Sequence, residues 1–167
     1  MDGAEPRDGF VSDYLLYLLA AASDAASDQF HAHVRAEGLR VPEWRVLACL
    51  MDEDGAMVTH LARLALVEQS RLTKIIDQMD ARGLVTRRGD EADRRRVRVW
   101  ITDAGRALAE RLVADARAHE AALLRALAGG DAARIKPALR ALIEALATSS
   151  SAGTAPVPGT GPEAPGG

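Results

Sequence analysis

Residues 68–101, EQSRLTKIIDQMDARGLVTRRGDEADRRRVRVWI, contain the pattern that decides the fold. Apolar residues in the first half recur at the spacing of one helix face, which predicts an amphipathic helix over 69–82. That face consists of Leu72, Ile75, Ile76 and Met79. Gly83 follows and suits the left-handed backbone that ends a helix. The opposite face carries side chains that can donate to phosphates and base edges, namely Ser70, Arg71, Thr73, Lys74 and Gln78.

The second half of the stretch predicts a β-hairpin with strands at 84–88 and 97–101. In the second strand, apolar residues alternate with Arg98 and Trp100, which is the period of a half-buried strand. The segment between the strands is too polar for a core, and its arginines crowd toward the second strand. A helix followed by a basic hairpin is typical of a winged helix-turn-helix, which binds DNA.

The helix-turn-helix needs a first helix, which we place at 58–66. Thr59 is the predicted N-cap. We expect no clean cap at Glu68 for the second helix, although a carboxylate there favours a helix N-terminus. The inward positions of the first helix are predicted to be Leu61, Leu64 and Ala65.

Further helices flank this unit. Residues 12–36 form one whose first turns are apolar nearly all round, a pattern that requires burial on several sides, as at a subunit interface. Pro42 lies in the first turn of the next helix, where proline is tolerated. After the hairpin, Thr102 or Asp103 caps a helix to about 127, and Asp131 caps the last one. The predicted buried positions are Leu108, Leu112, Ala116, Leu123, Leu124 and Leu127, then Ile135, Leu139, Leu142, Ile143 and Leu146.

The chain of 167 residues suits one domain, which we assign to 11–147. Residues 1–10 are polar, and residues 148–167 consist almost entirely of Ser, Gly, Pro, Ala, Thr and Val, so both segments are predicted to be disordered. Abundant Ala and Leu with few aromatic residues favour a mainly α protein with a small β component (α+β).

Charge is unevenly distributed along the chain. The net charge is −3, yet ten basic and only six acidic side chains lie between 57 and 102. A basic segment within an acidic remainder is expected of a DNA-binding head on a separate body, although a merely solvated face is the alternative. No run approaches the roughly 18 apolar residues of a membrane span, and no signal-peptide pattern is present. We therefore expect a cytoplasmic protein without membrane contact.

Several motifs resemble those of the MarR family of bacterial transcription regulators. They are SRLTKIID at 70–77, RGLV at 82–85, DRR at 93–95 and ITDAGR at 101–106. The similarity extends more weakly from about residue 14 to 146. It implies a homodimer whose body is formed by helices in 11–37 and 103–147. The winged helix-turn-helix of 42–102, with a two-stranded β wing, is then the part that binds double-stranded DNA.

Such a dimer presents two recognition helices about one duplex turn apart, so the expected operator is a palindrome of roughly 16 to 20 base pairs. Arg71 is the best candidate for a bidentate guanine contact. At the wing tip, Arg94 and Arg95 are expected in the minor groove, while Asp93 shapes the hairpin through a nearby guanidinium. The predicted DNA contacts are Gln69, Ser70, Arg71, Thr73, Lys74, Arg87, Arg88, Arg94, Arg95 and Arg98.

The resemblance also implies a repressor that a small aromatic carboxylate or phenol releases from DNA. The candidate ligand residues are Tyr17, Ser27, His31, His33, Trp44 and Arg45. Trp44 offers a stacking face and Arg45 a carboxylate fork, although Trp44 also fits the core and Arg45 a surface ion pair. His31 and His33 point to different sides of their helix, so they cannot chelate one metal together.

Other functions are weighed against this one. Cys49 lies on or beside the apolar stripe of its helix and fits a buried structural thiol, with a redox switch as the alternative. A winged-helix module for protein contacts is a further alternative, and salt-dependent duplex binding distinguishes the two. The sequence has no nucleophile elbow, phosphate loop or metal-binding spacing, so neither an enzyme nor a cofactor or metal is expected.

Overall fold

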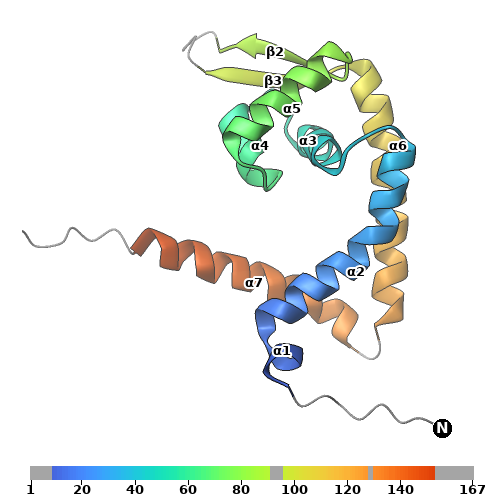
Figure 1. Ribbon diagram of the computed structural model, residues 1–167, viewed down its shortest axis with the longest axis vertical. Coiled ribbons are helices and arrows are strands. Elements are labelled where there is room, and N and C mark those ends of the chain that lie inside the picture. Colours follow the sequence, from blue (N-terminus) through green and yellow to red (C-terminus); the bar gives the residue numbers. More distant parts are fainter. Residues whose placement is uncertain (1–8, 91–95, 128–129, 153–167) are drawn as a thin grey trace, which may run out of the picture. The chain divides into compact units, whose positions relative to one another are not determined.

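The computed structural model describes residues 9–90, 96–127 and 130–152, with the backbone alone at 150–152. The chain forms two compact units, residues 1–122 and 123–167. The first contains α1 (Phe10–Asp13), α2 (Leu15–Ala36), α3 (Val41–Asp52), β1 (Ala56–Met57), α4 (Val58–Leu64), α5 (Gln69–Ala81), β2 (Val85–Gly89), β3 (Val97–Ile101) and most of α6 (Asp103–Ala126) (Figure 1). The second contains the end of α6 and α7 (Asp131–Ala152). The fold is mainly α with a small sheet, as predicted.

The three strands form one antiparallel sheet in the order β1-β3-β2. β2 and β3 are the predicted strands of the wing, and Val99 of β3 lies opposite Arg87 of β2. The predicted two-stranded arrangement is incomplete, because Ala56 of β1 pairs with Val99 on the other edge of β3. Two residues are too few to show strand alternation, so the sequence carries no signal for β1. The wing is thereby fastened at its base to the start of the helix-turn-helix.

The core of the first unit lies where α3, α4 and α5 pack beneath the strands of the sheet (Figure 1). All four residues predicted for the inner face of α5 are buried. Burial of a large aliphatic side chain contributes about 1.5–3 kcal/mol, so this face fixes α5 firmly on the core. The opposite face of α5 is therefore presented to solvent in one defined orientation.

The first predicted helix is interrupted at Tyr14, which has an extended backbone with ψ 119°. The helix was expected from about Ser12, whereas α1 already begins at Phe10 and forms a separate turn. The Ser12 hydroxyl donates to the Gly9 carbonyl at 2.7 Å, and the Phe10 and Tyr14 rings stack with centroids 5.0 Å apart. The prediction of disorder through residue 10 is wrong at Phe10, because these local contacts order it. Residues 1–8 lie outside the described part of the chain.

The first helix of the helix-turn-helix, α4, is shorter than predicted. It ends at Leu64, and Leu66 takes the left-handed conformation with φ 56°, while the next N–H donates to the Ala62 carbonyl at 3.0 Å. This Schellman arrangement is usually built on glycine, so the sequence contains no stop signal here. Leu64, predicted to face inward, is 47% exposed, and Ala62 is buried in its place. Thr59 was also assigned wrongly as the cap, because Met57 holds that position without a side-chain bond.

The N-terminus of α6 is capped as predicted. The Thr102 hydroxyl oxygen accepts a hydrogen bond from the Gly105 N–H at 3.0 Å. The same hydroxyl donates to the Gly83 carbonyl at 2.7 Å, so one side chain joins the turn after α5 to the start of α6. Leu112 is buried as expected.

In the second unit, α7 extends to Ala152. The prediction of disorder from 148 is therefore wrong over 148–152, and residues 153–167 lie outside the described part. The predicted apolar stripe of α7 is present but uncovered, with exposed fractions of 40%, 39%, 66% and 62% at Ile135, Leu139, Ile143 and Leu146. At the end of α6, Leu123 and Leu127 are also exposed, contrary to expectation for a single chain. Among the described helices, none has the length and apolar character needed to cross a membrane.

Candidate nucleic-acid interface

The recognition helix α5 has a side-chain cap that was not expected from the sequence. The Glu68 carboxylate accepts hydrogen bonds from the backbone N–H groups of Ser70 and Arg71 at 3.1 and 3.2 Å. Bonds from the Ser70 hydroxyl and from these N–H groups lower the pKa of the Glu68 carboxyl. An ionised carboxylate at a helix N-terminus is stabilised by the helix dipole. The cap therefore fixes Ser70 and Arg71 at the point where the chain enters the helix.

The outer face of α5 carries the polar residues that the sequence predicted to contact DNA. Gln69, Ser70, Arg71 and Lys74 are exposed, while Thr73 is partly buried and its hydroxyl donates to the Gln69 carbonyl at 3.0 Å. Within the described part of the chain, neither Arg71 nor Lys74 forms an ion pair. Both cations are thus available to an external anion.

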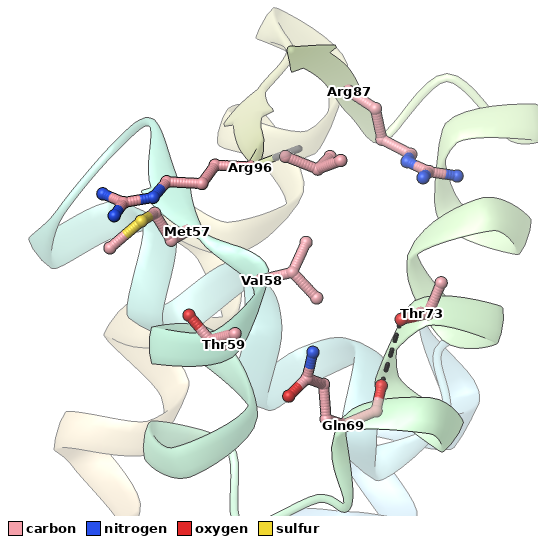
Figure 2. Close-up of a pocket in the computed structure, with 8 residues that line it drawn as sticks. Met57, Val58, Thr59, Gln69, Thr73, Arg87 and Arg96 are labelled. Atoms are coloured by element: carbon pink, nitrogen blue, oxygen red, sulfur yellow. Dashed lines mark hydrogen bonds between the residues drawn. The ribbon is translucent and has the colours of Figure 1, made fainter. Parts of the chain in front are cut away.

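A pocket of about 190 Å³ separates α5 from the wing (Figure 2). Figure 2 shows Gln69 and Thr73 on the helix side and Arg87 and Arg96 on the wing side. Its lining consists of Met57, Val58, Thr59, Gln69, Thr73, Arg87, Arg96 and Val97. Polar donors therefore lie on two sides of a partly apolar floor, an arrangement suited to a sugar-phosphate strand beside a base edge.

The predicted arginines of β2 have intramolecular partners. Arg87 forms an ion pair with Asp77 of α5, which links the wing to the recognition helix. Arg88 lies over the Trp100 ring, with its guanidinium carbon 5.8 Å from the ring centroid. Arg88 is exposed and the Arg87 side chain is 35% exposed, and both still have donors for a phosphate. The predicted wing-tip residues, Asp93, Arg94 and Arg95, lie outside the described part of the chain.

Arg98 is committed to holding the base of the wing. Its Nε pairs with Asp90 at 2.6 Å, and its Nη1 donates to the Gly55 carbonyl at 2.9 Å. On the same turn, Asp54 accepts from the Ile101 N–H at 2.9 Å and pairs with Arg106 of α6 at 2.9 Å. Apart from the Arg98–Asp90 pair, these bonds connect residues that are more than 40 positions apart, so no local sequence pattern predicts them. They fix the angle of the wing relative to α6 within the first unit.

A buried carboxylate behind the recognition helix was also missed. Glu43, in the first turn of α3, is 1% exposed and accepts from the Arg40 N–H at 2.7 Å and from the Arg40 Nη2 at 2.8 Å. Arg82, which follows α5, donates to Glu43 at 3.1 Å and to the Gly38 carbonyl at 2.8 Å. Glu43 thus fastens the end of α5 to the turn between α2 and α3. The spacing of Arg40 and Glu43 is that of a capping box, a local signal that could have identified part of this cluster.

The surroundings of the Glu43 carboxyl favour its ionised form despite its burial. Burial alone would raise its pKa. The hydrogen bonds from the Arg40 side chain and backbone and the charges of Arg40 and Arg82 outweigh burial, and together they lower this pKa below its ordinary value.

The residues predicted to bind a ligand do not gather at one place in the described part of the chain. Trp44 lines a depression of about 360 Å³ between α3 and α6, whereas His33 lines another of about 310 Å³ and pairs with Asp115 at 3.0 Å. Arg45 donates to the Ala65 carbonyl at 3.3 Å. Neither depression is lined by Tyr17, Ser27, His31 or Arg45. The six residues predicted to bind a ligand therefore do not line one common depression.

The depression at Trp44 contains an aromatic face, one cation that was not predicted, Arg117, and two acids, Asp52 and Glu120. The Trp44 and Phe30 rings form a T-shaped pair with centroids 5.4 Å apart, and Trp44 packs against the core, so its ring is part core and part pocket wall. Arg117 of α6 lines this depression, whereas Arg45, the predicted source of a guanidinium, does not. In the described part of the chain, no three His, Cys, Asp or Glu side chains gather in a way that could hold a metal.

Two titratable groups of this region have shifted pKa values. Burial and the charges of Arg45 and Arg35 lower the pKa of His31, which favours its neutral form. Burial and the charge of Asp52 raise the pKa of the Cys49 thiol. Because the thiolate is the reactive form, a raised pKa favours a structural Cys49 over a redox switch.

Comparisons with known proteins agree with the assignment of a winged helix-turn-helix fold. The family model described as MarR family matches residues 37–96. A MarR family transcriptional regulator from Silicibacter pomeroyi DSS-3 is 68% identical, with a TM-score of 0.77 over 83% of this chain and 99% of its own. A MarR family protein of Mycobacterium tuberculosis, solved in complex with salicylic acid, is 29% identical, with a TM-score of 0.62 over 77% of this chain and 95% of its own. The HTH-type transcriptional regulator TtmR of Methylorubrum extorquens is 28% identical over 59% of this chain, which spans about half the length of that relative.

Proposed function

The chain belongs to the MarR family of DNA-binding transcription regulators, and on that premise we propose that two copies of it bind a palindromic operator as a repressor. It is a regulator rather than an enzyme. Two recognition helices about one duplex turn apart would span roughly 16 to 20 base pairs. A dimer bound across a promoter blocks polymerase without a further contact surface, which favours repression over activation.

The observation that carries this proposal is the two-sided character of α5. Its apolar face is fully engaged in the core, and its outer face presents polar and basic side chains from the first turns. The first turns of a recognition helix are those that meet base edges in a major groove. Arg71 has a free guanidinium fork that matches the two acceptors of guanine, a contact worth about 1–3 kcal/mol of discrimination. Gln69, Ser70, Thr73 and Lys74 complete the proposed surface.

The test compares Arg71→Ala with Arg140→Ala, a matched loss of one exposed arginine on α7. Fluorescence anisotropy would measure affinity for a cognate operator, taken from the DNA upstream of the coding region, and for a random duplex. Arg71→Ala should weaken the cognate complex more than the random one, because only base reading depends on sequence. Arg140→Ala should change neither. Equal losses of affinity for the two duplexes in Arg71→Ala would mean that Arg71 does not contact a base edge specifically.

In the wing, we assign Arg87, Arg88, Arg94, Arg95 and Arg96 to the DNA backbone and minor groove, with Asp93 shaping the tip. Arg98 is instead assigned to the base of the wing, since its guanidinium already bonds to Asp90 and to the Gly55 carbonyl. Arg98→Ala should therefore lower DNA affinity without changing its dependence on salt. Arg88→Ala should reduce the slope of log affinity against log salt by about one unit. A reduced slope for Arg98→Ala would mean that Arg98 contacts a phosphate after all.

The proposed effector is a small aromatic carboxylate or phenol bound at the depression formed by α3 and α6. Trp44 supplies a stacking face and Arg117 a fork for a carboxylate. The relative bound to salicylic acid is consistent with this chemistry. A ligand can bind more tightly to a dimer whose recognition helices are not spaced to fit the two half-sites of B-DNA. Such a ligand lowers operator affinity by the difference between its affinities for that dimer and for the dimer with the DNA-binding spacing.

Titration of the operator complex with a panel of aromatic carboxylates tests this assignment. An active compound should release the wild-type protein from DNA. The Arg117→Gln variant should need at least a tenfold higher concentration of the compound for release, and its DNA affinity without the compound should equal that of the wild type. Arg111→Gln, on the same helix but outside the depression, is the control. Release of Arg117→Gln at the wild-type concentration would place the effector elsewhere.

A further inference from the structure

A second depression adjoins α5, and two of its four cations, Arg35 and Arg40, do not belong to the surface proposed so far. Its volume is about 490 Å³. Four of its lining residues are cations and none is an acid; the lining consists of Arg35, Arg40, Val41, Pro42, Arg71, Lys74, Ile75 and Gln78. A concave surface with this composition attracts an anion.

The two hollows beside α5 lie on opposite flanks of the helix. Gln69 and Thr73 line the pocket toward the wing, whereas Arg71, Lys74 and Gln78 line the basic depression. Consecutive helical residues are about 100° apart, so Arg71 lies about 200° around the axis from Gln69. The exposed face between these flanks is the one proposed to enter the major groove.

Arg40 is held at the edge of the basic depression by a buried partner. Its Nη2 donates to Glu43, which is 1% exposed, and to the Gln78 side chain of α5. The Arg40 side chain is itself 55% exposed. A guanidinium has five N–H donors, so the Nε and Nη1 hydrogens are left for an external acceptor. Because one end of the guanidinium is fixed, less conformational entropy is lost when the other end binds an anion.

The remaining cations have little internal compensation: Lys74 acts on the Glu68 carboxylate, which does not line the depression. In the described part of the chain, Arg35, Arg71 and Lys74 form no ion pair. Glu43 lies close to Arg40 but is shared with Arg82, so it compensates only part of the local positive charge. The depression therefore has a net positive charge that an anionic partner would offset.

Groove dimensions indicate which anion fits. A B-DNA major groove is about 12 Å wide, and a helix with its side chains measures about 10–12 Å across. A helix inserted into the groove therefore meets a sugar-phosphate strand on each flank. The wing side of α5 faces one strand, so the basic depression faces the other.

We infer that this depression binds a backbone phosphate on the strand opposite the wing, with Arg40 and Arg35 as phosphate ligands and Glu43 as the positioning residue for Arg40. The inference rests on the proposed function and adds two cations from outside the helix-turn-helix to the DNA surface. Phosphate contacts carry no sequence information, so this site would set orientation and affinity rather than specificity.

The first experiment measures duplex affinity between about 50 and 200 mM salt, the range in which phosphate contacts change affinity strongly. Arg40→Gln and Arg35→Gln should each reduce the slope by about one unit, and each should weaken cognate and random duplexes by the same factor. Arg35→Gln keeps the test independent of folding, because Arg35 has no internal ion pair to lose. Arg111→Gln, which lies on α6 and pairs with Glu37, is the matched control and should leave the slope unchanged.

The second experiment tests the role of Glu43 with a double-mutant cycle. Glu43→Gln should weaken duplex binding by a larger factor in the wild-type background than in the Arg40→Gln background, because the second background has already lost the part of the effect that runs through Arg40 and keeps only the bond to Arg82. Arg82→Gln removes the other partner of the same carboxylate and should leave the salt slope unchanged. Additive effects of Glu43→Gln and Arg40→Gln would overturn the positioning role.

The remaining outcomes separate this inference from the proposed function. A wild-type protein with no duplex affinity at low salt would overturn both. Wild-type binding with an unchanged slope in Arg40→Gln and Arg35→Gln would overturn only the phosphate site. A third outcome is that millimolar pyrophosphate raises the melting temperature of the free wild-type protein but not of these variants, while the salt slopes of their DNA binding stay unchanged. That outcome would assign the depression to a free anion instead.

Discussion

At the scale of single residues, Gly105 is a position where only glycine fits. A Cβ built there would lie 2.0 Å from the Leu84 carbonyl oxygen, a backbone atom that cannot move aside without shifting the start of β2. Gly105→Ala should therefore destabilise the protein by about 1–3 kcal/mol or more, the range for overpacked cores. Urea unfolding measures this. Gly89→Ala is the control, because a Cβ at Gly89 meets nothing within 4 Å. Equal midpoints for the two variants would contradict the close approach of α6 to Leu84.

The second residue-scale prediction concerns Glu43 and pH. A free Glu titrates near pH 4.3, and the folded carboxyl has a lowered pKa, so its stabilising effect is present above about pH 4.3 and is lost as the pH falls through the lower folded value. Glu43→Gln should lower the free energy of unfolding by about 1–3 kcal/mol at pH 7. That gap to wild type should narrow as the pH falls below about 4. Urea unfolding at several pH values measures it, and a gap that stays constant would mean that Glu43 does not titrate differently on folding.

At the scale of elements, the hydroxyl of Thr102 joins two segments. It accepts from the first turn of α6 and donates to the turn that ends α5. Thr102→Ala should lower the free energy of unfolding by about 0.5–2 kcal/mol, the range for a lost N-cap. Thr102→Ser keeps the hydroxyl and should recover most of this loss. If Ser and Ala at this position were equally unstable, the lost methyl group rather than the cap would explain the effect.

The elements also show which features a sequence reveals. The inner face of α5, the turn at Gly83 and the Thr102 cap were predicted correctly because each depends on residues within a few positions of one another. The end of α4 was predicted wrongly because Leu66 adopts a left-handed backbone without being glycine. Glu68 lacked the residue type usual at an N-cap, although its carboxylate makes the bonds of one.

Most of the site's supporting contacts escaped prediction for a different reason. Glu43 meets Arg82, and Asp54 meets Arg106, across large separations in the chain. Such pairs exist only after the helices have packed, and single charged residues carry no periodicity to reveal them. The proximity of Arg117 to Trp44 has the same origin, since the two residues come together only through the packing of α6 on α3.

At the scale of the whole molecule, α2 and α7 each carry large apolar side chains that are exposed. In α2, Leu15, Leu16 and Leu18 are 55%, 58% and 45% exposed, and in α7 the stripe around Ile143 is uncovered as well. Contiguous apolar surface of this kind marks an interaction site. In the proposed dimer, these faces are covered by the second copy.

The corresponding prediction places a charge in the α7 stripe. Ile143→Glu should convert the dimer to a monomer in sedimentation equilibrium, because a carboxylate buried in an apolar interface is strongly disfavoured. A monomer contacts one half-site, so the slope of log affinity against log salt should fall to about half the wild-type value. Thr148→Glu adds the same charge about 140° around the helix and should leave both measurements unchanged. A variant at Ile143 that stayed dimeric with the full slope would show that this stripe of α7 is not what holds two copies on one operator.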